Sequence, residues 1–105
     1  MDPFRPTLIG AALSLLATIA LANGCQGVVT SAREASTLRA NLGDDFAIVT
    51  PGVRPPGGNV ADQVRVVTPA EAIAAGASHI VVGRPITEAA DPAAEARAIL
   101  EQIGR

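Results

Sequence analysis

Apolar and polar residues alternate along this chain in short blocks, and the blocks predict strands that are each followed by a helix. The expected strands are apolar, rich in β-branched residues and bounded by turn residues, and they cover residues 27–30, 46–50 and 79–82. Helical spacing of apolar residues follows each of them and ends near Gly43, Gly76 and Gly104. Regular alternation of this kind is typical of parallel βα units.

Capping signals predict where these helices begin. Ser31 with Glu34, and Thr68 with Glu71, have the spacing of a capping box, in which a hydroxyl and a carboxylate satisfy free backbone N–H groups of the first turn. The Asp-Pro pair at 91–92 predicts the start of the last helix. The apolar stripes expected on the first and last of these helices consist of Ala35, Leu38 and Leu42, and of Ala94, Ala98, Leu100 or Ile99, and Ile103.

The first 23 residues form an atypical N-terminal segment with two interpretations. Residues 7–22 are almost entirely apolar or small, with Arg5 before them and Cys25 after them, as in an export or lipoprotein leader. The alternative is a strand at 7–10 that runs into a buried helix at 11–22 and ends at Asn23-Gly24. We favour the second, because Asn-Gly is not a small-residue cleavage site and the run is shorter than the ~20 residues of a membrane span.

The composition indicates one α/β domain over residues 1–105. Phe4 and Phe46 are the only aromatic residues, so aliphatic side chains must build the core, as in parallel sheets covered by helices. The net charge of −2 argues against nonspecific binding of nucleic acid. The single cysteine excludes an internal disulfide and suits a reducing cytoplasm. No spacing of His, Cys, Asp or Glu suggests a metal site.

Candidate chemistry gathers after the second and third predicted strands. The segment TPGVRPPGG (residues 50–58) contains Arg54 and is followed by Gln63, and Gly83 and Arg84 follow the last strand. Arginine offers a charged, planar set of donors, and glycine lets the backbone approach a ligand closely. Loops at the carboxyl ends of parallel strands are where α/β proteins bind ligands. These residues predict a phosphate-monoester site, and the alternative is a solvated loop with ordinary surface arginines.

The order TPGVRP, then Asp62-Gln63, then VVGRPI resembles the C-terminal part of the orotidine 5′-phosphate decarboxylase family, over residues 24–105. The resemblance implies a partial (β/α)8 barrel with parallel strands, roughly its last four βα units. It also implies a carboxy-lyase that converts orotidine 5′-monophosphate (OMP) to UMP without metal or cofactor. Arg54, Arg84 and Gly83 would then bind the phosphate, and Gln63 would reach both phosphate and base.

The resemblance does not extend to the catalytic centre. The family's Asp-x-Lys-x-x-Asp motif is absent, and all eight basic residues are arginine. We therefore assign no catalytic residue and expect no activity from these 105 residues alone. A partial barrel exposes strand edges and apolar helix faces, so we expect a homodimer or pairing with an N-terminal barrel half, in the cytoplasm and off the membrane.

Two other functions remain open. One is a non-catalytic module or pseudoenzyme that binds a nucleotide phosphate. The other is a related keto-gulonate-phosphate decarboxylase, although Arg54 and Gln63 at this spacing argue against it.

Overall fold

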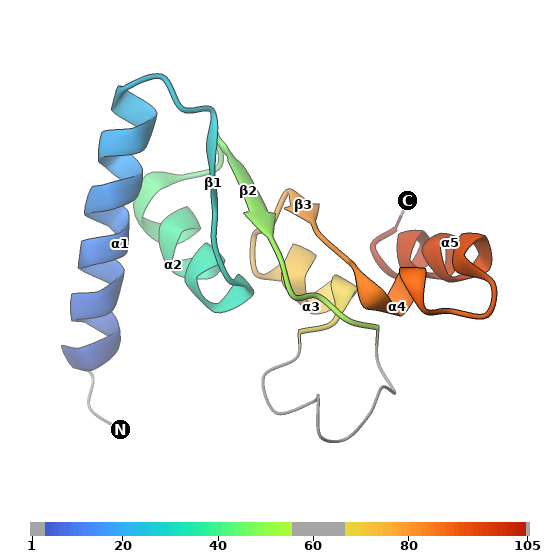
Figure 1. Ribbon diagram of the computed structural model, residues 1–105. Helices are drawn as coiled ribbons and strands as arrows, with labels where there is room; N and C mark the ends of the chain where they lie inside the picture. The colour runs from blue at the N-terminus through green and yellow to red at the C-terminus, as the bar shows by residue number, and fades with distance from the viewer. Residues whose placement is uncertain (1–3, 56–66, 105) are drawn as a thin grey trace.

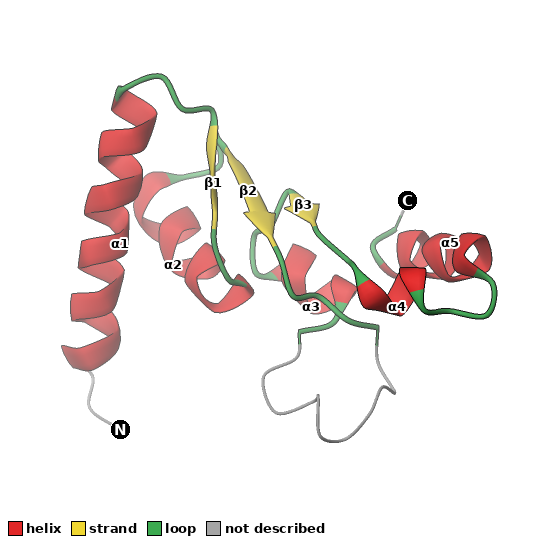
Figure 2. Ribbon diagram, in the orientation of Figure 1, coloured by secondary structure: helices red, strands yellow, loops and turns green. Residues whose placement is uncertain are grey.

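Three short parallel strands lie side by side at the centre of the fold (Figure 1). The computed structural model describes residues 4–55 and 67–104. In chain order the elements are α1 (Phe4–Ala22), β1 (Gly27–Val29), α2 (Ala32–Leu42), β2 (Ala47–Thr50), α3 (Pro69–Ala74), β3 (His79–Ile80), α4 (Arg84–Thr87) and α5 (Pro92–Gln102). Figure 2 shows the helices and strands of this order by colour. Within the described ranges, no helix is long and apolar enough to cross a membrane.

The strands follow one another across the sheet in chain order and run parallel, as they do in a βα barrel. Its strand order is β1-β2-β3, with Val29 opposite Val49 and Val49 opposite His79. Each strand therefore pairs with the next one along the chain, and a helix, α2 or α3, lies in each connection. The predicted parallel βα units are confirmed.

The two faces of the sheet differ in how they are covered. Val28, Ile48 and Ile80 point to the same face, because side chains alternate along a strand. On that face Ile48 is fully buried. The clusters that pack there are Ala17, Ala35, Leu38 and Ile48, and, around α3, Ala32, Val53, Ala72 and Ala77. On the opposite face Val29 is 72% exposed, so the helices α1 to α3 cover one face and leave the other open.

The N-terminal segment differs from its prediction. Residues 7–10, expected as a strand, belong to the single helix α1, so the predicted first strand is wrong. Pro6 lies in the first turn, where a missing backbone N–H has no intrahelical partner, and no further proline interrupts the helix before Asn23-Gly24. The helix packs against α2, where the Asn41 side-chain amide donates to the Ser14 hydroxyl at 2.9 Å.

The two predicted capping boxes form to different extents. At α3 the box is complete: the Glu71 N–H donates to the Thr68 hydroxyl, and the Thr68 N–H donates to the Glu71 carboxylate, both at 3.2 Å. These hydrogen bonds with Thr68 hold the pKa of Glu71 below its ordinary value. At α2 the Ser31 hydroxyl caps the helix as predicted. The other predicted hydrogen bond of this box, from the Ser31 N–H to the Glu34 carboxylate, does not form, so that part of the prediction is wrong. The Glu34 carboxylate instead accepts from the hydroxyls of Thr30 at 2.8 Å and Ser31 at 3.0 Å.

The C-terminal part is more helical than predicted. The strand β3 is two residues long, and the segment expected to be a loop after it begins the short helix α4. Asp91 caps α5 as predicted, by accepting from the Ala94 N–H at 3.1 Å. On α5 the buried residue is Ile99, whereas Ala94, Ala98 and Leu100 are exposed. The predicted stripe is therefore wrong at the alanines, because α5 packs against α3 and α4 along the side that carries Ile99.

Arg39 joins the end of α2 to the segments that lead into β2 and β3. Its Nε donates to the Gly76 carbonyl at 2.9 Å, and its Nη1 donates to the Phe46 carbonyl at 2.7 Å and the Gly43 carbonyl at 3.3 Å. The guanidinium carbon lies 4.6 Å from the centre of the Phe46 ring, within the range of a cation–π contact. Gly76 has φ +117, and a Cβ there would lie 2.6 Å from the Arg39 side chain, so this position requires glycine.

Candidate functional site

Arg54 follows β2 and is fixed by the backbone around it. Gly52 turns the chain with φ +73. Val53 is 1% exposed and forms a parallel bridge with Val67, and the Arg54 N–H donates to the Val67 carbonyl at 3.0 Å. Arg54 therefore extends from a buried anchor at the carboxyl end of the sheet.

Arg84 follows β3 at the same end of the sheet. The Val81 N–H donates to the Thr50 carbonyl at 2.9 Å, so β2 and β3 stay paired up to the start of their loops. The Gly83 carbonyl then accepts from the Ile86 N–H at 3.0 Å, and Arg84 is the first residue of α4. Since parallel strands end at one edge of a sheet, the two arginines start from neighbouring points.

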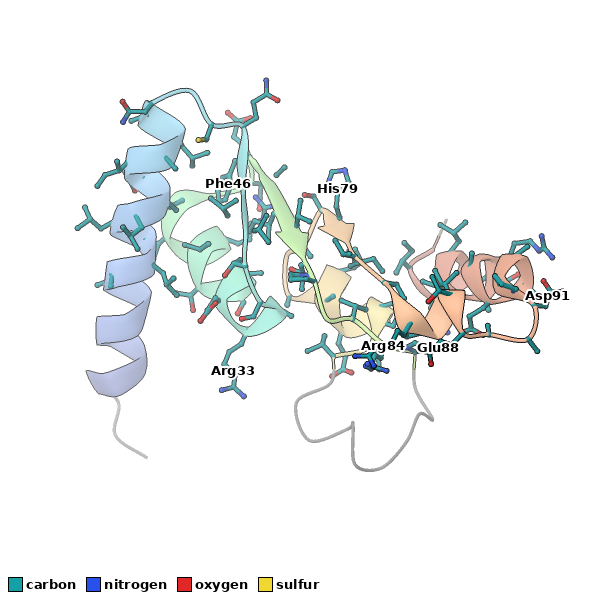
Figure 3. The ribbon with its side chains drawn as sticks, in the orientation of Figure 1. Arg33, Phe46, His79, Arg84, Glu88 and Asp91 are labelled. Atoms are coloured by element: carbon teal, nitrogen blue, oxygen red, sulfur yellow. The ribbon has the colours of Figure 1, made fainter. Side chains whose placement is uncertain are left out.

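The two arginines line one hollow in the surface. The described residues that line it are Arg54, Arg84, Pro85, Glu88 and Ala89, and its volume is about 290 Å³. Figure 3 labels Arg84, at the start of α4, beside Glu88, which follows the end of this short helix. Arg54 is half-buried and Arg84 is exposed, so solvent or a ligand can reach both side chains.

Two of the four predicted site residues thus meet in this hollow. Gly83 lies directly before Arg84 and has an ordinary negative φ of −101, with open space where a Cβ would stand. Gln63 lies outside the described residues. That all four bind a ligand stays a prediction, since the geometry settles only where the arginines lie.

The sequence did not lead us to Glu88 as a candidate site residue, although it lines the hollow. The signal that could have found it is its position four residues after Arg84, which places both on one side of a helix. The segment was expected to be a loop, in which that spacing carries no meaning.

No other arrangement in the described part of the chain matches a known kind of reaction centre. The described ranges contain no group of three or more His, Cys, Asp and Glu side chains that could hold a metal ion. Cys25 is exposed, and the His79 ring lies 3.1 Å from the Ser78 hydroxyl, which also bonds to the backbone of Ile48. The hydroxyls of Thr30 and Ser31 at the end of β1 are engaged by Glu34 in the cap of α2.

Comparison with known sequences gives a consistent match. Residues 10–99 match the family described as orotidine 5′-phosphate decarboxylase / HUMPS. The chain is 56% identical over 90 residues to orotidine 5′-phosphate decarboxylase of Hydrogenovibrio crunogenus, which covers 86% of this chain and 38% of that protein. It is 61% identical over 80 residues to the enzyme of the same name from Methylobacterium sp., which covers 76% of this chain and 34% of that protein.

Comparison with solved structures agrees. The fold is similar to orotidine 5′-phosphate decarboxylase from Lactobacillus acidophilus, with a TM-score of 0.76 and 40% identity over 92% of this chain and 38% of that one. It is also similar to the enzyme of that name from Pyrococcus horikoshii, with a TM-score of 0.67 and 25% identity over 97% of this chain and 46% of that one. The chain therefore spans 34–46% of the length of these relatives, and the predicted partial (β/α)8 barrel is confirmed.

Proposed function

Because this chain belongs to the orotidine 5′-phosphate decarboxylase / HUMPS family, we propose that it forms the phosphate-binding part of a nucleotide site for OMP and UMP. The observation that carries the proposal is the shared hollow of Arg54 and Arg84. Two side chains thirty residues apart in the sequence converge there from the ends of neighbouring strands. That position is where α/β barrels bind phosphate groups.

The chemistry of the hollow fits a phosphate monoester. Each guanidinium stays charged at neutral pH and presents parallel N–H donors that match two phosphate oxygens. Two of them together balance the charge of a phosphate dianion. In this proposal Arg54 and Arg84 bind the phosphate, the Gly83 backbone N–H supports it, and Gln63 reaches the phosphate and the pyrimidine base.

For the whole enzyme we propose the reaction that the names of the relatives imply, removal of the carboxylate of OMP to give UMP. These 105 residues contain no lysine, and an arginine does not release its proton at neutral pH. The proton donor for the product carbon must then come from a segment other than this one. We therefore propose that this chain binds the nucleotide and does not turn OMP over by itself.

A non-catalytic module that binds a nucleotide phosphate is the second candidate, and the same hollow favours it. The two proposals differ in what happens when an N-terminal barrel half that contains the Asp-x-Lys-x-x-Asp motif is added. Decarboxylation of OMP by the mixture supports the first, and UMP binding without turnover in the mixture supports the second.

We also propose that the chain pairs in the cytoplasm with a second copy or with such an N-terminal half. The open face of the sheet carries Val29 at 72% exposure, and α1 exposes Leu15, Leu16 and Ile19 by more than half. Exposed apolar faces and free strand edges favour association. Light scattering on the purified chain should give twice the monomer mass, or the monomer mass with a shift to a complex when the half is added; a monomer unchanged by the half contradicts this proposal.

The proposed site is tested by calorimetric titration with UMP. An arginine–phosphate contact contributes about 1.5–3 kcal/mol, so Arg84→Ala should weaken UMP binding at least about tenfold. Arg97→Ala is the matched control, because Arg97 is exposed on α5 and does not line the hollow. Equal binding by both variants, or no binding by the unaltered chain, contradicts the proposed function.

A further inference from the structure

Glu88 places a negative charge in a site that otherwise suits an anion. Its N–H donates to the Arg84 carbonyl at 2.8 Å, which puts the two residues one helical turn apart. Side chains at this spacing lie on the same side of a helix, and both line the hollow (Figure 3). Among the described residues that line the hollow Glu88 alone is acidic, so these side chains carry two positive charges and one negative charge.

A carboxylate there weakens the attraction for any anion, and the loss grows with the charge of the ligand. We propose that Glu88 makes the hollow selective for the single phosphate of a monoester over ligands with two adjacent phosphates. This inference rests on the proposed function, because it concerns the same site. The two guanidinium groups suffice for one phosphate dianion, and Glu88 repels the additional charge of a second phosphate.

The alternative role for Glu88 is to position Arg84 through a pair of opposite charges four residues apart. The two roles predict opposite results for Glu88→Gln. A positioning role predicts weaker binding of every phosphate ligand, because Arg84 loses its orientation. Repulsion predicts tighter binding, with a larger gain for the ligand of higher charge.

The test is calorimetric titration of the unaltered chain and Glu88→Gln with UMP and with UDP at low ionic strength. We expect the variant to bind both more tightly and to shift the UDP-to-UMP affinity ratio toward UDP by about three- to tenfold. The shift should shrink when salt is added, since Arg84 and Glu88 are solvent-exposed. Asp45→Asn is the control: it removes one negative charge at the other end of the strands, in the exposed turn before β2, and should leave the ratio unchanged.

The outcomes distinguish failure of the selectivity role from failure of the proposed function. An unchanged ratio in Glu88→Gln, or weaker binding of UMP, overturns the selectivity role and leaves the phosphate site standing. A ratio that shifts equally in Asp45→Asn overturns it as well, because the effect is then one of overall charge. Failure of the unaltered chain to bind UMP overturns the proposed function and the inference together. Circular dichroism of each variant verifies that the fold is retained.

Discussion

Arg39 connects distant parts of this fold through one guanidinium. Its hydrogen bonds reach the carbonyls of Gly43, Phe46 and Gly76, which belong to the end of α2, the entry to β2 and the turn before β3. A carbonyl that loses its donor inside a fold costs more than the bond itself contributed, because the group was removed from water. The side chain therefore holds the α2–β2 and α3–β3 turns in register.

Arg39→Met should lower the free energy of unfolding by about 2–4 kcal/mol, since it removes several hydrogen bonds and the contact with the Phe46 ring. Arg33→Met on the same helix is the control, because Arg33 is exposed and should change stability by no more than about 0.5 kcal/mol. Urea unfolding followed by circular dichroism measures both. Equal stability of the two variants would contradict a stabilising role for the Arg39 hydrogen bonds.

Among the helices and strands, those with local signals were predictable from the sequence. The Thr68–Glu71 box and the Asp91 cap act within one helical turn, and both helices begin where these residues predict. The short apolar strands were also found, because Gly and Asp residues bound them. Local chemistry was sufficient for these elements since their partners are a few residues away.

Elements that depend on distant contacts were not predictable. Residues 7–10 have the composition of a strand, yet they belong to α1, which packs against α2. Gly83-Arg84-Pro85 suggested a loop, yet Pro85 lies in the first turn of α4, where proline is tolerated. Glu88 was missed for that reason, and the contact from Arg39 to Gly76 spans 37 residues, beyond the reach of any local pattern.

In the whole molecule, the candidate site depends on how the strands are joined rather than on any one segment. Arg54 and Arg84 could be selected from their types and neighbours as candidates for binding phosphate, and that role stays a prediction. Their convergence on one hollow follows from the parallel pairing of β2 with β3, which the alternation of apolar blocks also predicted. The open face of the sheet and the exposed side of α1 are consistent with the chain spanning 34–38% of its curated relatives.

The most direct measurement of the central claim is a double-mutant cycle on UMP binding with Arg54→Ala, Arg84→Ala and the double variant. If both guanidinium groups bind one phosphate, their effects depend on each other, and the double variant should differ from the sum of the single variants by at least about 0.5–1 kcal/mol. Effects that add within about 0.3 kcal/mol would show that the arginines act at separate places and would contradict a shared phosphate site.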